Sequence, residues 1–244
     1  REKRPAAPVA SVRGGDIRGT MRLSSATDDD GDTGASSVVV EKKPIALGKD
    51  EFALQVRRLE YLGRLLRRVR NPLCPLNGVL TWLSFPVLQW SSASGPQVQR
   101  ALKDDLRAVQ RAVELRCPVT ALVVGLEDET GFRELVRRVG RENSRSSRFG
   151  RGFGVWNPPS AEQLHALVAH ACGAFEDWVY NLFREKNSLS KPGNARLYAL
   201  LCKVRRDVQT RLGNVLASAL APETDKASDY EPLLFSGCYF AGTG

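Results

Sequence analysis

The stretch CPVTALVVGLED, residues Cys117–Asp128, decides the fold of this chain. It opens with Cys117 and Pro118, continues as a run of apolar residues and ends in two acidic residues. Short apolar runs rich in valine are typical of strands buried in a parallel sheet. A helix pattern begins directly afterwards, at Thr130. The stretch therefore predicts a strand followed by a crossover helix, which is the repeating unit of an α/β fold.

The turn after this strand lies where guanine-nucleotide-binding folds carry a Thr/Asn-Lys-x-Asp motif. In those proteins the lysine packs on the base, and the aspartate accepts two N–H donors of the base. Val124, Gly125, Leu126 and Glu127 fill the four positions here, so the lysine is absent and glutamate replaces aspartate. This degenerate nucleotide loop retains the layout of the motif and lacks its contacts. It indicates a scaffold rather than an enzyme.

A second apolar run and two helix patterns extend the unit. Leu76–Phe85 is apolar almost throughout, which predicts a strand buried on both faces. Apolar residues at three- and four-residue spacing predict helices over Asp50–Val69 and Pro96–Leu115. The expected fold class is α/β, with an incomplete P-loop-NTPase-like parallel sheet, crossover helices and a helical subdomain after it. The sequence contains no G-x-x-x-x-G-K-[ST] phosphate loop, and Gly48-Lys49 come closest to one.

The chain divides into four predicted segments. Residues 1–48 are rich in Gly, Ser, Ala, Asp and Pro and predict a disordered linker, because they offer little apolar surface to bury. Residues 49–157 predict the degenerate NTPase-like α/β domain, which ends in a Gly/Ser/Arg-rich loop over residues 143–157. Residues 158–220 predict the helical subdomain, opened by a helix cap at Ser160. Residues 221–244 predict an extended tail.

The charge balance favours anionic partners. Lys and Arg number 36 against 27 Asp and Glu, which gives a net charge of +9. An excess of this size suits acidic protein faces, anionic lipid headgroups or nucleic acid, and it does not choose among them. The five cysteines are far apart and form no C-x-x-C motif, which favours buried thiols in a reducing compartment.

Few residues of the chain suit catalysis or metal binding. The two histidines, His165 and His170, are five residues apart and do not share a helix face. The acidic run Asp28–Asp32 departs from the calcium-loop pattern on both sides of its glycine. No cofactor, no metal and no catalytic residue are expected, although catalysis by carboxylates alone stays open.

The arginines are the strongest positive signal for binding. They are expected to contact partners or an anionic surface, with a solvated helix face as the plain alternative. Arginine binds carboxylate and phosphate through two parallel hydrogen bonds, which favours both kinds of partner. Phe149 and Phe153 alternate with two of them, which would suit base stacking on nucleic acid. The candidate binding residues are Arg57, Arg58, Arg64, Arg67, Arg68, Arg148 and Arg151.

Four stretches in a fixed order resemble the cytoplasmic region of the IcmF/TssM family, the large inner-membrane component of type VI secretion systems. Residues 74–80, CPLNGVL, resemble the family's "RPLNGV". Residues 118–132 are similar to its "PVYVLFTKxD…GF", and residues 148–154 are placed like its "R…WG" loop. Residues 233–243, LLFSGCYFAGT, are similar to its "LRGxYFTS". The arginine-rich helix predicted over Asp50–Val69 runs into the first stretch and belongs to it, so together the four span residues 50–244.

The chain departs from the family pattern at the nucleotide motif and at Ser236, where the family has arginine. The resemblance implies a non-catalytic scaffold that contacts protein subunits of a secretion or envelope complex. It implies a place at the cytoplasmic face of the inner membrane, with the anchor on segments outside this chain. Two alternatives stay open: an NTP-hydrolysing domain with its phosphate loop on an upstream segment, and a basic nucleic-acid-binding module.

Overall fold

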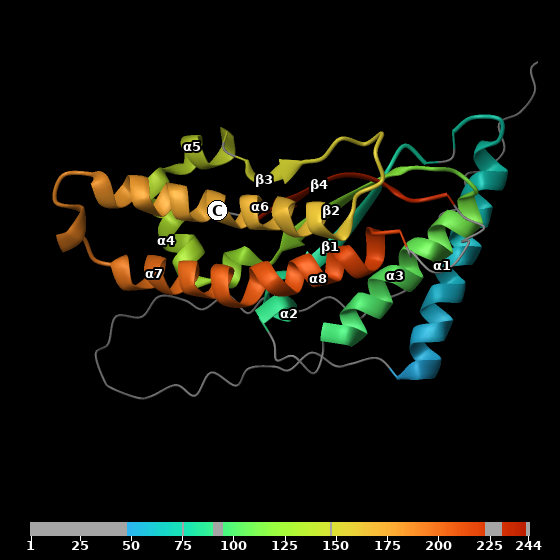
Figure 1. The fold of residues 1–244 in the computed structure, drawn as a ribbon, viewed down its shortest axis with the longest axis horizontal. Helices are drawn as coiled ribbons and strands as arrows, with labels where there is room; N and C mark the ends of the chain where they lie inside the picture. The colour runs from blue at the N-terminus through green and yellow to red at the C-terminus, as the bar shows by residue number, and fades with distance from the viewer. Residues whose placement is uncertain (1–47, 75, 90–94, 147, 223–230, 243–244) are drawn as a thin grey trace, which may run out of the picture. The chain divides into compact units, whose positions relative to one another are not determined.

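The computed structural model describes residues 48–242, apart from residue 75, residues 90–94, residue 147 and residues 223–230 (Figure 1). All of these described residues belong to one compact unit, residues 44–244. The predicted linker over residues 1–48 lies outside the described residues, except for its last position. Helices and a four-stranded sheet make up the unit, which confirms the α/β fold class.

The sheet is mostly parallel and has the strand order β1-β2-β4-β3. Strands β1 (Val79–Ser84), β2 (Pro118–Val124) and β4 (Leu234–Phe240) run in the same direction. Strand β3 (Phe149–Gly152) pairs antiparallel with β4. The two predicted apolar runs therefore form adjacent parallel strands. The strand predicted at Leu76–Phe85 was expected to be buried on both faces, as in the centre of a sheet, whereas β1 lies at the edge.

The segment predicted to be an extended tail contains β4, which lies between β2 and β3. Its register with β2 shifts by one residue at Ser236, since Val119 pairs with Phe235 and Thr120 pairs with Gly237. The Ser236 hydroxyl hydrogen-bonds to the Thr120 hydroxyl at 2.5 Å and donates to the Val119 carbonyl at 3.2 Å. These bonds hold the extra residue of the bulge in place.

The helices follow the predicted order with small changes in their ends. Helix α6 begins with a capping box, because the Ser160 hydroxyl accepts from the Gln163 amide and the Gln163 side chain accepts from the Ser160 amide. The last helical segment, residues 194–220, is continuous and has a π-helical turn, η3, in its middle. The helices and short helical turns have the bounds α1 Lys49–Arg70, α2 Phe85–Gln89, α3 Gly95–Val113, η1 Leu126–Asp128, α4 Thr130–Val139, α5 Arg141–Ser146, α6 Ala161–Arg184, η2 Ser188–Ser190, α7 Asn194–Lys203, η3 Val204–Val208 and α8 Gln209–Leu220.

The loop predicted over residues 143–157 is partly regular. Helix α5 enters it and β3 lies inside it. Its glycines and arginines have little strand propensity, so the sequence alone gave no strand signal. Pairing with β4 and burial of Phe149 stabilise β3 instead. The prediction of an irregular loop was wrong at these positions for that reason.

One face of the sheet carries the core. Val119, Ala121 and Val123 of β2 are buried, as are Phe235 and Cys238 of β4. Helix α6 packs on β3 and β4, and α8 packs between α6 and α3 (Figure 1). These three helices form the layer over this face.

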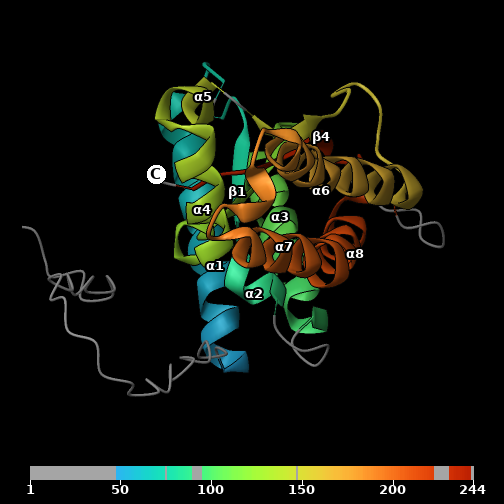
Figure 2. The same cartoon turned by 90° about the vertical axis from the view of Figure 1, so that its left-hand side faces the viewer.

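The sequence predicted that the opposite face of the sheet is also buried, but this face is partly exposed. Leu80 and Trp82 of β1 are 53% and 72% exposed. On β2, Thr120, Leu122 and Val124 are only half-buried. In the turned view of Figure 2, α6 and α8 lie on one side of β1, and α1 and α4 lie on the other. The prediction that Leu76–Phe85 is buried on both faces was wrong, because Leu80 and Trp82 stay exposed on the side of β1 where α1 and α4 lie.

Candidate interaction surface

The four residues predicted to form the degenerate nucleotide loop, Val124–Glu127, begin with the last residue of β2 and end within η1. Gly125 has φ +87°, in the left-handed region that favours glycine. A Cβ added at Gly125 would lie 3.4 Å from Cδ of Pro86, at the start of α2. A lysine at this position would therefore strain the backbone, and its Cβ would contact Pro86 of α2.

The next loop residue, Leu126, is part of the core. It is fully buried, and a Cβ added at Gly242 would lie 3.4 Å from its Cβ and 2.6 Å from Cε1 of Phe132. The amide of Ala241 donates to the Val123 carbonyl at 2.8 Å, so the chain stays close to β2 beyond the end of β4. The loop residue that follows Gly125 thus closes one end of the core.

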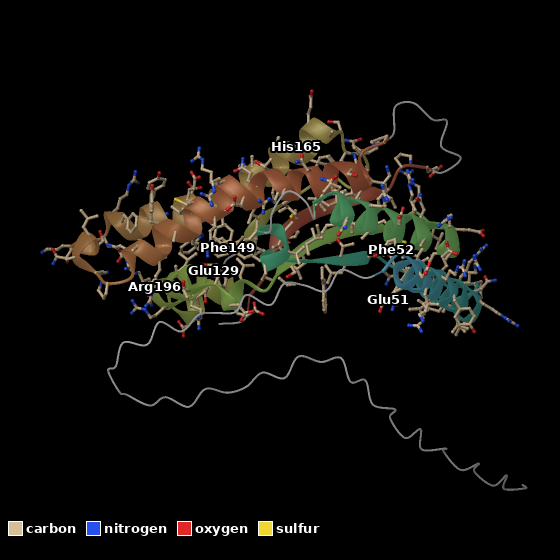
Figure 3. The ribbon with its side chains drawn as sticks, turned by 90° about the horizontal axis from the view of Figure 1, so that it is seen from below. Glu51, Phe52, Glu129, Phe149, His165 and Arg196 are labelled. Atoms are coloured by element: carbon tan, nitrogen blue, oxygen red, sulfur yellow. The ribbon has the colours of Figure 1, made fainter. Side chains whose placement is uncertain are left out.

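A cluster of charged and amide groups lies beside this loop. Glu129, labelled in Figure 3, accepts two hydrogen bonds from Nζ of Lys203, at 2.7 and 3.0 Å. The Gln89 amide donates to the same carboxylate at 3.5 Å. These contacts connect the residue before α4 to the ends of α2 and α7. The cluster joins elements rather than presenting an unpaired acid or base.

A buried ion pair holds α4 against the loop before α7. The Glu134 side chain accepts from Nη2 of Arg137 at 2.6 Å and from Nε of Arg138 at 2.7 Å. Arg138 also donates to the Pro192 carbonyl at 2.6 Å, and a Cβ added at Gly193 would lie 2.5 Å from the Glu134 carboxyl carbon. The Arg137 hydrogen bond holds the pKa of Glu134 below its ordinary value of 4.5, with a smaller contribution from Arg138, although burial acts the other way.

The candidate arginines on α1 divide into paired and unpaired side chains. Arg64 forms an ion pair with Glu60 at 3.3 Å, and Arg67 forms one with Glu114 of the turn after α3. Arg57, Arg58 and Arg68 are exposed, and within the described part of the chain they make no ion pair. The unpaired three are the ones that remain available to a partner.

The other two candidates, Arg148 and Arg151, lie on different elements from the first five. Both are exposed, Arg148 just before β3 and Arg151 within it. Nη1 of Arg151 is 3.1 Å from Nε2 of His170 on α6. The sequence-predicted arginines are thus divided between α1 and the β3 edge of the sheet.

The aromatic residues beside Arg148 and Arg151 face the core. Phe149, labelled in Figure 3, is buried and its ring stacks on Phe175 with 4.8 Å between ring centroids. The ring of Phe153 packs on that of Phe235, with 6.0 Å between the ring centroids. These rings are engaged within the protein and do not offer a platform for base stacking.

Helix α1 carries two apolar stripes, and the apolar spacing that predicted the helix includes residues of both. Phe52, Val56 and Leu59 are half-buried beside α3. Leu62 and Val69, which continue the same three- and four-residue spacing, are 50% and 72% exposed. Periodicity identified the helix, and the position of α3 decides which of its apolar residues are buried.

The exposed stripe forms what we call the outer α1 surface. At about 100° per residue its members occupy an arc of about 120° around the helix. The apolar members are between 43% and 72% exposed. Arg57 and Arg64 lie next to this arc. The outer α1 surface consists of Leu54, Arg58, Tyr61, Leu62, Leu65, Arg68 and Val69.

The remaining chemistry-bearing groups form no second site. Within residues 48–242, gaps excluded, no three His, Cys, Asp or Glu side chains gather as metal ligands would. The cysteines are free thiols, and Cys117, Cys172 and Cys238 are buried. Burial raises the pKa of the Cys172 and Cys238 thiols to about 12, so both stay protonated. None of the described helices combines the length and apolarity that a membrane span requires.

The comparisons with known proteins give one match. A family model described as the IcmF-related N-terminal domain matches residues 55–244, which includes every described strand and all of α1 except its first six residues. No curated protein and no solved structure matches the chain.

Proposed function

This chain belongs to the family of the IcmF-related N-terminal domain, and from this premise we propose that it is a non-catalytic scaffold of a type VI secretion-related complex. It holds protein subunits of that complex at the cytoplasmic face of the inner membrane. The observation that carries the proposal is the outer α1 surface. The family membership supports the secretion complex, and the surface supports the protein contacts.

The outer α1 surface has the composition of a protein-binding face. Exposed apolar side chains lie next to one another along several turns of α1, and such patches commonly mark interaction sites. Tyrosine and arginine are both enriched at the energetic centres of interfaces. The unpaired Arg58 and Arg68 lie within the patch, where each could bind a partner carboxylate with two hydrogen bonds. A partner helix with an apolar stripe and flanking acidic residues fits this surface.

The geometry of the degenerate nucleotide loop supports the non-catalytic part of the proposal. Gly125 occupies the lysine position with a backbone angle that other residues adopt only at a cost. Leu126 is in the core rather than at an open site. The loop thus serves packing between β2, α2 and the end of β4.

The experiment measures binding of the purified chain to the envelope subunits encoded beside its gene. The Tyr61→Glu, Leu65→Glu double variant places two carboxylates in the outer α1 surface. We expect at least a tenfold loss of affinity for one of those subunits, which corresponds to about 1.4 kcal/mol. The matched control carries Tyr180→Glu and Leu189→Glu, which are also exposed and lie outside α1.

Equal loss of affinity in both double variants, or no loss in either, would contradict the role of the outer α1 surface. Magnesium-dependent, saturable binding of GTP or ATP at micromolar concentration would contradict the non-catalytic assignment. Isothermal titration measures the affinity of the wild-type chain and of both double variants for each subunit. The same method, with the wild-type chain and GTP or ATP, measures nucleotide binding.

A further inference from the structure

Strand β1 is an unprotected edge of the sheet. Among the described strands it pairs only with β2, so its second edge presents unpaired backbone N–H and C=O groups. Its sequence, VLTWLS, contains no charged residue and no proline. Natural edge strands commonly carry such residues to prevent pairing with other chains. β1 has neither of these two safeguards.

The side chains of β1 extend this open edge onto the uncovered face of the sheet. Leu80 and Trp82 are 53% and 72% exposed on that face. Trp82 pairs across with Leu122 of β2, which in turn pairs with Tyr239 of β4. A row of three large side chains therefore crosses the face, with its most exposed member at the edge.

The exposure is greatest at the β1 end of this row. At the other end, a Cβ added at Gly150 would lie 2.6 Å from Cδ1 of Tyr239, so the tyrosine ring lies directly on β3. Gly152 is also close, with its added Cβ 3.2 Å from the tyrosine hydroxyl. Tyr239 is only half-exposed as a result. What stays open is the strip along β1 and the adjoining half of β2.

Parallel strands are normally buried on both faces, so an uncovered strip on this sheet indicates a missing element. Figure 3 shows the sheet from the side: α6 and α8 lie above the strands, and below them none of the described helices lies between α4 and α1. An added strand at β1 would satisfy the unpaired backbone groups and place its own side chains against Trp82. A helix on the same face would leave those backbone groups unpaired.

Charge decides between the possible sources of this strand. The chain has a net charge of +9, and α1, which leads into β1, carries seven basic and three acidic residues. Two copies joined through β1 would bring these positive charges together, which disfavours a second copy. A segment with acidic residues would be attracted to the same surroundings.

We propose that β1 accepts an additional strand from an acidic partner protein. The incoming segment is extended, alternates apolar residues that cover Leu80 and Trp82, and carries carboxylates near its ends. Backbone hydrogen bonds along β1 provide affinity, and side-chain contacts with Leu80 and Trp82 provide selectivity. This binding mode goes beyond the proposed function, since it uses β1 and not the outer α1 surface.

The test uses the full chain and a short synthetic peptide of alternating valine and threonine with two glutamates at each end. Hydrogen exchange is measured with and without the peptide, at concentrations up to about 1 mM. A strand added at the edge protects the amides that point away from β2, which alternate along β1. We expect this alternating protection, and at least tenfold weaker binding by the Trp82→Ala variant. The Trp156→Ala control, at an exposed position outside the sheet, should bind like wild type.

Several outcomes would overturn the proposal. They are no binding at the highest concentration, equal binding by a peptide with proline at its centre, and protection without the alternating pattern. A wild-type dimer that Trp82→Ala dissociates would assign the edge to a second copy. If deletion of residues 1–47 increases exchange at β1, the chain's own segment covers the edge. The Tyr61→Glu, Leu65→Glu variant should bind the peptide normally, which separates this test from that of the proposed function.

Discussion

Single residues decide the conformation and packing of the loop Val124–Glu127, which was predicted to be a degenerate nucleotide loop. Gly125 has a positive φ that costs other residues about 1–2 kcal/mol, and it lies against Pro86. Leu126 fills the core where strand and turn meet. The relation of this loop to a nucleotide-binding ancestor stays a prediction, while its packing role is visible in the contacts.

Glu134 is a single residue whose replacement should lower the stability of the chain. Its partner Arg138 is 5% exposed, so replacing the glutamate leaves a buried charge without its carboxylate. We expect Glu134→Gln to lower the free energy of unfolding by about 3 kcal/mol or more, as for other broken buried pairs. Urea denaturation at pH 7 measures this loss. The control is Arg137→Gln, because Arg137 is 64% exposed and its contribution should be under about 1 kcal/mol.

The pH dependence of the same pair follows from the lowered pKa of Glu134. A carboxyl with a depressed folded-state pKa adds stability above its unfolded-state pKa, near the ordinary 4.5. That stability is lost as the pH falls through the lower folded-state pKa. The wild-type chain should therefore lose more stability than Glu134→Gln between pH 5 and strongly acidic pH. Parallel loss in the two proteins would contradict the assignment.

At the scale of elements, helix α1 shows how one periodic pattern serves two surfaces. Its inner stripe packs on α3 and its outer stripe remains exposed. The close approach of the two helices depends on Gly63, where an added Cβ would lie 2.7 Å from Cβ of Ala112. A contact this short requires the helices to separate.

Gly63→Ala is therefore expected to destabilise the chain, by about 1–3 kcal/mol as in other overpacked cores. The matched control is Gly173→Ala in α6, because nothing lies within 4 Å of its added Cβ. That substitution should stabilise the chain by about 0.5–1 kcal/mol through helix propensity. Thermal unfolding of the two variants measures the opposite signs, and equal shifts would contradict the packing of α1 on α3.

The elements also differ in how far the sequence predicts them. The bounds of α3 were predicted to within a few residues, and the start of α6 was predicted at its observed cap, because apolar spacing and the cap at Ser160 are local signals. β3 was missed, since a strand of glycine, arginine and one phenylalanine has no local signal. Its cross-strand partner β4 lies more than 80 residues later in the chain. Such a strand depends on pairing rather than on propensity.

At the scale of the whole molecule, the last strand in sequence holds the sheet together. β4 pairs with β2 on one side and with β3 on the other, and Phe235 and Cys238 are fully buried. Deletion of residues 231–244 removes this strand and leaves β3 without its partner. We expect the shortened chain to lose cooperative thermal unfolding and near-ultraviolet circular dichroism. Deletion of residues 1–47 is the control, because every described helix and strand lies outside that segment. Cooperative unfolding of the chain that lacks residues 231–244 would contradict this role of β4.

The sequence by itself determined the α/β class, the two neighbouring parallel strands, the order of the helices and the family resemblance. These features follow from hydrophobic periodicity, caps and short motifs, which are local along the chain. The tertiary structure alone decided that β4 is interior, that β1 is an edge and that Leu62, Val69 and Trp82 are exposed. An apolar residue in the sequence indicates only that its burial would be favourable. Which of them are buried depends on the elements packed against them, and those come from distant parts of the chain.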